Sequence, residues 1–205
     1  MNLKYQTHYI SEQQYLEDEK TREIKHEYVD GEVYAMSGAS RSHNILSLSI
    51  GRLLENHLDG TRCNTFVADM KVRIEKRNST CFFYPDVVVA RDDENGHDYY
   101  TEKPLIIVEV LSKSTRRYDK ALKFNDYITI PTLQEYVLIE QDFAEVEVCR
   151  RNNHWVSERY FLGDDVTFVS IGLTLSIEAI YRRVQNEDVL EFLKAKELEQ
   201  QENQL

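Results

Sequence analysis

The spacing of apolar residues along the chain predicts helices and strands that follow one another closely. Apolar residues at helical spacing predict a helix over 42–57, which Gly60 can terminate. Ser11, with Gln14 three residues later, resembles a capping box and predicts a shorter helix over 11–20. The remaining predicted elements are strands at 26–29 and 32–36, extended stretches at 64–75 and 81–90, a strand at 105–111, a helix at 114–128, strands at 134–140, 145–151, 155–161 and 166–169, and a helix at 176–183.

Local features indicate how these elements connect. Asp30-Gly31 can take the positive φ values of a two-residue I′ turn, so the strands on either side of it are expected to form a hairpin. The unbroken run Val87-Val88-Val89 predicts a strand buried on both faces, and so does the apolar segment 105–111. A strand, a helix and a second strand follow one another over 105–140, which predicts a right-handed crossover and a parallel pair.

These elements predict an α/β fold with a mixed central sheet, flanking helices and additional β-hairpins. No internal repeat or low-complexity linker interrupts the chain. We therefore expect one domain over residues 1–183, followed by an acidic C-terminal helix or tail over 184–205.

The charge balance limits the classes of function. With 36 acidic and 25 basic residues, the formal net charge is −11. This charge excludes a protein that coats nucleic acid by electrostatics alone, because phosphate neutralisation needs clustered Lys and Arg. Any contact with nucleic acid must therefore be local. Part of the acidity lies in 184–205, so the rest of the protein is less acidic than the total implies.

The cysteines and the N-terminus indicate a reducing compartment. Cys63, Cys81 and Cys149 are odd in number and widely spaced, and no Cys-x-x-Cys or Cys/His ligand pattern is present. We interpret them as reduced core thiols. Residues 1–10 lack the features of a signal peptide, and no run of 18 apolar residues is found. We therefore expect a cytoplasmic protein without a membrane segment.

Two carboxylates stand in strands that should be buried. Glu109 interrupts the most apolar strand, where desolvation costs several kcal/mol unless the side chain is paired, protonated or bound to a cation. A solvent-facing or Arg-paired Glu109 is the plainer alternative. Asp86 follows Pro85, which marks a strand start or bend that can aim a side chain into a cleft, although a capping role is equally simple. On neighbouring strands, the two carboxylates could together hold a hard cation.

The segment from 113 to 123 reverses the charge of the chain locally. It holds five cations and one anion, and its cations stand at the start of a predicted helix, where phosphate can bind. The alternative is a solvated basic face in which Asp119 and Lys123 form an ordinary i, i+4 ion pair. The cations are Lys113, Arg116, Arg117, Lys120 and Lys123.

Over about residues 8–183 the sequence resembles the Uma-two-type endonuclease family (domain of unknown function 820) of the restriction-endonuclease-like PD-(D/E)XK superfamily. Pro85-Asp86 and Glu109 match the superfamily motif, but Leu111 occupies the place of its lysine. The resemblance rests on the segments Glu27-Tyr28-Val29-Asp30-Gly31-Glu32, Ser42-His43-Asn44, Tyr84-Pro85-Asp86-Val87-Val88-Val89 and Ile107-Val108-Glu109-Val110-Leu111-Ser112, on Asp119, Lys123 and Tyr127, and on Glu135-Tyr136.

The resemblance implies that the missing lysine has moved to the following helix. Lys123 lies on one helix face with Asp119 and Tyr127, whereas Lys120 matches the family pattern less well. Glu27 resembles the additional acid that many superfamily members contribute, although a strand-surface glutamate is the alternative. His43 matches a family position near a helix start, and we interpret it as a capping or core histidine rather than a ligand.

The function implied by the resemblance is metal-assisted hydrolysis of DNA phosphodiester bonds by a homodimer. Asp86, Glu109 and the Val110 carbonyl would hold Mg²⁺, with Mn²⁺ as a substitute, and Lys123 would orient water or stabilise charge. Flanking phosphates would be bound by Lys113, Arg116, Arg117 and Lys120. Two alternatives remain: a catalytically lapsed module that acts in DNA or protein interaction, and a structural homo-oligomer in which the basic segment is buried between subunits.

Overall fold

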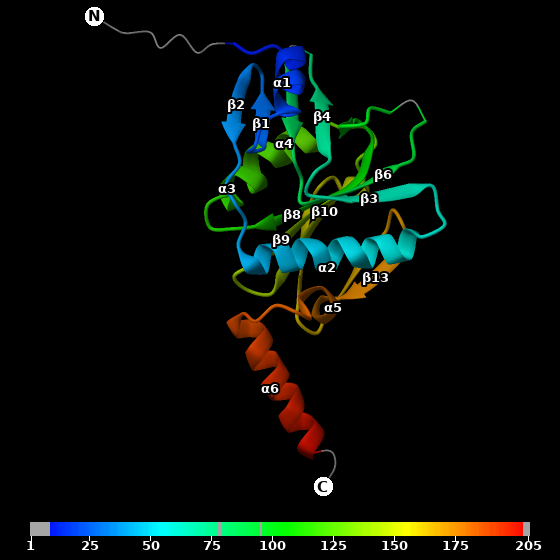
Figure 1. Cartoon of the computed structure of the whole chain (residues 1–205). Helices are drawn as coiled ribbons and strands as arrows, with labels where there is room; N and C mark the ends of the chain where they lie inside the picture. The colour runs from blue at the N-terminus through cyan, green and yellow to red at the C-terminus, as the bar shows by residue number, and fades with distance from the viewer. Residues whose placement is uncertain (1–8, 78, 95, 203–205) are drawn as a thin grey trace, which may run out of the picture.

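In the computed structural model, which describes residues 9–77, 79–94 and 96–202, the strands are divided between two large sheets (Figure 1). The five-stranded sheet contains, in spatial order, β2 (Glu32–Ala35), β1 (His26–Val29), β5 (Thr80–Phe83), β4 (Lys71–Glu75) and β7 (Tyr100–Thr101). The six-stranded sheet contains β11 (Ser157–Phe161), β10 (Glu145–Arg150), β9 (Glu135–Glu140), β8 (Pro104–Leu111), β6 (Val87–Arg91) and β3 (Cys63–Val67). A separate hairpin pairs β12 (Asp165–Phe168) with β13 (Leu173–Ser176).

The pairing of strands confirms the predicted α/β class. β8 and β9 run parallel, as the strand–helix–strand order predicts, and the other pairs of the six-stranded sheet are antiparallel, so this sheet is mixed. The hairpin β1–β2 also forms as predicted, with Asp30 at φ 47° and Gly31 at φ 91°.

Two stretches that the sequence pattern predicts as continuous are each split between the two sheets. The stretch 64–75 breaks at Ala68, which has a left-handed φ of 64° and whose N–H donates to the Asp86 carbonyl. The stretch 81–90 breaks around Pro85, because proline has no N–H to donate to a ladder. Each of these two stretches therefore crosses from one sheet to the other, and Asp86 lies at the second of the two crossings. The short strands β7 and β13 are not predicted by the sequence pattern.

The helices form where predicted, with one departure in geometry. Ser11, Ser40 and Ser176 cap helices by accepting a hydrogen bond from a backbone N–H in the first turn. The helix expected over 114–128 is shorter and is interrupted by a π-helical turn, η1 (Asp119–Lys123). The helical segments are α1 (Glu12–Glu19), α2 (Arg41–Leu58), α3 (Arg116–Tyr118), α4 (Phe124–Tyr127), η2 (Arg151–Asn153), α5 (Ile177–Tyr181) and α6 (Glu187–Glu202).

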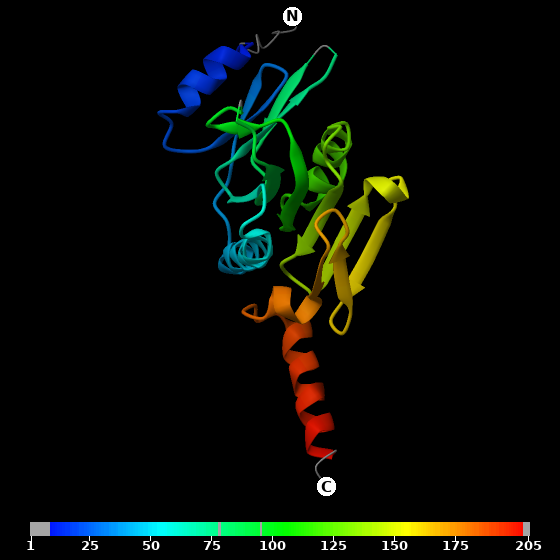
Figure 2. The same cartoon turned by 90° about the vertical axis from the view of Figure 1, so that its right-hand side faces the viewer.

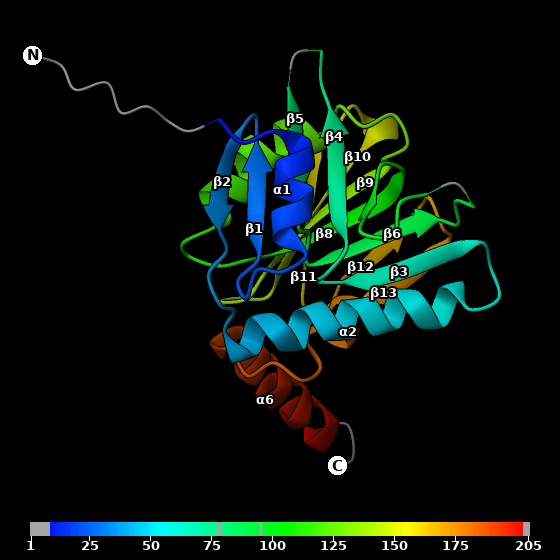
Figure 3. The same cartoon turned by 45° about the horizontal axis from the view of Figure 1, so that its top comes forward.

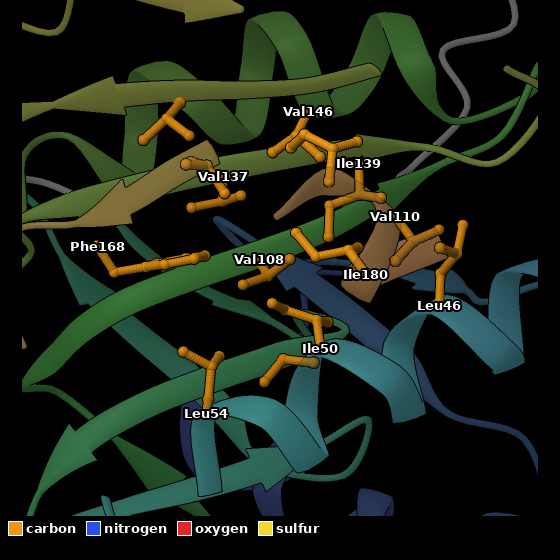
Figure 4. Close-up of a cluster of buried hydrophobic side chains, with 14 of the residues drawn as sticks. Leu46, Ile50, Leu54, Val108, Val110, Val137, Ile139, Val146, Phe168 and Ile180 are labelled. Atoms are coloured by element: carbon orange, nitrogen blue, oxygen red, sulfur yellow. The ribbon is translucent and has the colours of Figure 1, made fainter. Parts of the chain in front are cut away.

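The main hydrophobic core lies between α2 and the six-stranded sheet (Figure 4). Ile50 and Leu54 of α2 are completely buried and belong to the same cluster as Val108 of β8. At Gly51 the helix approaches β3 so closely that an added Cβ would lie 2.6 Å from a methyl carbon of Val67. A second cluster fills the space between the sheets and α4, and a third joins α1 to the five-stranded sheet.

The C-terminal helix α6 projects away from the body of the protein (Figures 1 and 2). Its first turn is attached, because Val189 is buried in the main core together with Val184, which precedes the helix. Leu193 and Leu198, further along the helix, are exposed. Cys81 and Cys149 are buried, Cys63 is half-buried, and all three are free thiols. Of the helices in the described ranges, none is both long enough and apolar enough to span a bilayer.

The burial of α2 gives a direct test of this core. Ile50→Ala should lower the free energy of unfolding by about 2–5 kcal/mol, because it opens a cavity under a completely buried side chain. Leu48 of the same helix is 60 % exposed, so Leu48→Ala should change the free energy of unfolding by less than about 0.5 kcal/mol. Urea denaturation measures both values, and equal effects of the two substitutions would contradict the orientation of α2.

Candidate active site

A single buried lysine lies among three carboxylates that come from both large sheets and the π-helical turn. Lys123 is 5 % exposed, and its Nζ lies 2.8 Å from Glu27 Oε1 and 3.1 Å from Glu109 Oε1. Asp119 Oδ1 is 3.5 Å away. Glu27 belongs to β1, Glu109 to β8 and Asp119 to η1, so one ammonium group links the two sheets to the helical segment between them.

The strand pattern of β8 directs Glu109 toward this lysine. Ile107 and Leu111 belong to the cluster between the sheets, and the alternation of side chains places Glu109 on the same face. The Tyr127 hydroxyl donates to Glu109 Oε1 at 3.2 Å. Glu109 therefore has two buried partners, neither of them an arginine, and it does not face solvent.

The π-helical turn positions the other two members of the cluster. Asp119 and Lys123, its first and last residues, are both buried, and the Tyr136 hydroxyl donates to the Asp119 carbonyl at 3.0 Å. Single π-helical turns within α-helices occur frequently at functional sites. The structure corrects the sequence-based alternative of a solvated basic face at Lys123, because this side chain is directed into the protein.

Asp86 forms the partly exposed edge of the same site. Its Oδ2 accepts the Val110 N–H at 2.7 Å and lies 3.3 Å from His43 Nε2. Both side chains retain some contact with solvent, 18 % for Asp86 and 17 % for His43. The backbone N–H of His43 donates to Ser40 in the helix cap, but its ring contacts Asp86. The ring is therefore not the capping or plain core group that the sequence pattern favours.

The electrostatics of the cluster reflect an excess of negative charge in a buried place. Burial raises the pKa of Glu109 well above its usual range, against the lowering effect of Lys123, and it also raises the pKa of Asp119. Burial alone would lower the pKa of Lys123, but the facing carboxylates raise it well above its usual range. Burial likewise opposes protonation of His43, yet the contact with Asp86 gives it a raised pKa.

Comparison with known proteins shows the family to which the chain belongs. The pattern of the Uma2 family, described as "Putative restriction endonuclease", matches residues 12–179. The chain belongs to this family. Two relatives from Synechocystis sp., the uncharacterized proteins slr1290 and sll1609, are each 38 % identical to this chain. The matches cover 84 % and 69 % of this chain and 92 % and 80 % of the relatives' own lengths.

A solved structure shows the same fold. A "putative nuclease belonging to DUF820" from Anabaena variabilis superposes with a TM-score of 0.64 at 19 % identity, and the match covers 78 % of this chain and 92 % of that one. The restriction-endonuclease-like fold class predicted from the sequence is therefore confirmed, as is the resemblance to the Uma2 family.

In this Uma2 protein the basic segment is largely neutralised by acidic partners. Arg116 lies 2.6 Å from Glu140, and Lys120 lies 2.8 Å from Glu147. Only two of the four residues predicted to bind phosphate, Lys113 and Arg117, are exposed and form no ion pair within the described ranges.

The donor atoms suit a hard divalent cation, although their arrangement is not that of a ready-made metal site. Carboxylate oxygens and the Val110 carbonyl are the kind of ligand that Mg²⁺ prefers. Three carboxylates lie within 3.5 Å of the Lys123 ammonium group, and Asp86 lies at the edge of the site. No group of three His, Cys, Asp or Glu side chains in the described residues is arranged to hold a metal ion. The reason is visible in the contacts: Glu109 turns toward Lys123 and Tyr127, and Asp86 toward Val110 and His43.

The cluster predicts a pH-dependent effect of removing its lysine. Because the pKa of Glu109 is raised in the folded state, the folded protein binds a proton that the unfolded chain releases, so stability falls as pH rises above the ordinary value of 4.5. Lys123→Met removes the charge that opposes this shift. We expect a small loss of stability near pH ~5 and a loss of about 3–5 kcal/mol near pH ~8.

Denaturant unfolding at several pH values measures this effect. Lys196→Met, which removes an exposed ion pair with Glu178, serves as the control and should cost less than about 1 kcal/mol at every pH. A loss for Lys123→Met that does not change with pH would show that the carboxylates do not depend on this ammonium.

Proposed function

We propose that this protein is a Mg²⁺-dependent DNA endonuclease whose site consists of Asp86, Glu109 and Lys123. One observation carries the proposal: a buried lysine is outnumbered by carboxylates at the crossing between two sheets, where a structural ion pair would need only one partner. Membership of the Uma2 family and the nuclease-like fold support the same assignment.

The position of each residue indicates its proposed role in the reaction. Asp86 and Glu109, with the Val110 carbonyl, would hold the cation, which when bound supplies Lewis-acid polarisation of the phosphate and acidifies a water molecule. Lys123 would orient that water or offset the charge that develops on the phosphate. Tyr127 holds one oxygen of Glu109, and the Val110 N–H with His43 holds one oxygen of Asp86, so both carboxylates are positioned in advance.

Mn²⁺ can substitute for Mg²⁺ in such a site, because it also accepts carboxylate and carbonyl oxygen ligands and tolerates an imidazole nearby. Glu27 would act as the additional acid by sharing the charge of Lys123, to which it is the nearest carboxylate at 2.8 Å.

A second function has one observation in its favour. Glu109 is held by Lys123 and Tyr127 in a closed arrangement, which is what a lapsed active site kept for DNA or protein interaction would show. The two functions differ in whether bound DNA is cut, so a cleavage assay separates them.

Substitution of Glu109 tests catalysis without loss of the fold. Glu109→Gln removes a proposed cation ligand, so the cleavage rate should fall by at least about 100-fold, which corresponds to an activation barrier higher by ~2.7 kcal/mol. The same substitution relieves the excess negative charge of the cluster, so the melting temperature near pH ~8 should stay equal or rise. The assay uses supercoiled and single-stranded DNA with Mg²⁺, Mn²⁺ or EDTA. The control is Glu75→Gln, whose side chain is 71 % exposed. Binding of DNA without cleavage under all metal conditions would favour the lapsed module.

The two free cations should carry most of the phosphate contact of the basic segment. The double substitution Lys113→Met, Arg117→Met should weaken DNA binding and reduce the slope of log K against log salt by about 1.8, since each phosphate contact contributes about 0.9. Lys103→Met, an exposed lysine paired with Asp93, is the control and should leave the slope unchanged. Fluorescence anisotropy over a range of salt concentrations measures the slope, and an unchanged slope in the double variant would place the DNA elsewhere.

We also propose a homodimer, because cutting both strands of a twofold-symmetric duplex needs two sites related by a twofold axis. Light scattering at micromolar concentration should give a mass near twice the 24.2 kDa of the chain. A monomeric mass would instead predict nicking of one strand.

A further inference from the structure

A cavity of about 570 Å³ lies against α1, on the face of the five-stranded sheet opposite Lys123. The alternation of side chains separates the two faces: Phe83 of β5 contacts Tyr127 on one side, while Phe82 contacts Tyr15 of α1 on the other. Lys71 and Tyr84 stand at the bottom of this cavity, and Tyr99, which is 51 % exposed, lies at its mouth. Its volume falls within the range of small-molecule sites.

Lys71 is a buried cation without an anionic partner. It is 6 % exposed, and in the described ranges its ammonium donates only to the Tyr84 hydroxyl, at 3.1 Å. Burial raises the pKa of Tyr84, so this partner stays neutral. Burial lowers the pKa of Lys71, the nearby Glu19 carboxylate opposes this shift, and Lys25 adds to it. A buried ammonium with no carboxylate in direct contact costs stability, and such a cost is typical of a binding site.

Several other charged side chains around the cavity have partners, although the Glu19 Oε2 atom is buried without a hydrogen-bond partner among the described residues. Lys20 contacts Glu17, Lys25 contacts Asp69, and Glu19 accepts hydrogen bonds from the His26 N–H and the Tyr84 hydroxyl. Lys71 therefore marks the position where a ligand would bring negative charge. The Nζ atoms of Lys25 and Lys71 lie 5.7 and 5.0 Å from the centroid of the Tyr84 ring. An anion beside this ring would therefore be close to both ammonium groups.

The aromatic side chain at the mouth indicates the rest of the ligand. Two ammonium groups lie near the ring of Tyr99: the Nζ atom of Lys20 is 5.8 Å and that of Lys71 is 5.9 Å from the ring centroid. A half-exposed ring offers a stacking face for a flat group, and every nucleobase has such a face. A ligand that carries both a flat ring and an anionic group could contact Tyr99 and Lys71 together, because the Lys71 ammonium lies only 5.9 Å from the Tyr99 centroid.

We propose that this cavity binds one nucleotide, with its phosphate between Lys25 and Lys71 and its base against Tyr99. The choice of a nucleotide among ring-bearing phosphates rests on the proposed nuclease function. The rim of the cavity adjoins the candidate active site: Lys25 donates to the Ala68 carbonyl at 2.9 Å, and the Ala68 N–H donates to the carbonyl of Asp86. The nucleotide can therefore be the end of a DNA strand that extends from the candidate active site, or it can be a free mononucleotide.

Binding is measured with EDTA present, so that no metal-dependent cleavage occurs. The result therefore does not depend on whether the protein is an active nuclease. Calorimetry with dTMP, thymidine and inorganic phosphate tests the free nucleotide. A single-stranded oligonucleotide with 2-aminopurine at its end tests the strand, because stacking on Tyr99 changes the fluorescence of this base. We expect dTMP or the oligonucleotide end to bind, with Kd raised at least tenfold by Lys71→Met and by Tyr99→Ala. Thymidine, which lacks the phosphate, should bind at least tenfold more weakly than dTMP.

The stability of the variants separates a binding lysine from a structural one. Lys71→Met should melt at the same temperature as the unchanged protein or higher, because it removes a buried charge without an ion pair. Lys103→Met, at an exposed lysine, should change neither melting nor binding. The proposal is overturned if Lys71→Met leaves the affinity for both dTMP and the oligonucleotide unchanged, or if inorganic phosphate binds as tightly as dTMP and Tyr99→Ala has no effect.

Discussion

The attraction between one buried ammonium group and the carboxylates around it is the interaction on which the centre of this structure depends. Lys123 contacts Glu27 of one sheet, Glu109 of the other and Asp119 of its own helical segment. Each of these acids would be costly to bury alone, and removing the single cation would leave all of them without compensation. The relative position of the two sheets is therefore coupled to the charge state of this cluster.

The backbone departs from regular geometry at the places that build this cluster. Ala68 adopts a left-handed conformation, Pro85 ends a strand, and a π-helical turn carries Asp119 and Lys123. Each departure breaks a regular element, and each brings a polar side chain or its supporting backbone to the junction between the sheets. Regular secondary structure is thus interrupted where distant acids contact one lysine, and local departures of this kind are expected at functional or strained sites.

In this chain of net charge −11, most of the cations of the basic segment 113–123 are paired with acidic side chains. Arg116 and Lys120, which could have formed a wide basic surface, are bound by Glu140 and Glu147. The free positive charge that remains in the basic segment is confined to Lys113 and Arg117, and a separate buried ammonium, Lys71, lies across the five-stranded sheet. Any nucleic acid must be recognised through such local features, because the overall field of the protein repels phosphate.

Local patterns in the sequence determined most of the elements and the residues worth attention. Only the tertiary structure decided how these elements are arranged (Figure 3) and how those residues meet. The helix over 42–57, the Asp30-Gly31 hairpin and the parallel β8–β9 pair follow from periodicity, turn chemistry and element order, which are local properties. The division of 64–75 and 81–90 between two sheets does not, because alternation looks the same on either side of a crossing. The burial of Lys123 and the contact of His43 with Asp86 join residues 14 to 96 positions apart, and the sequence alone gives no measure of the distance between them.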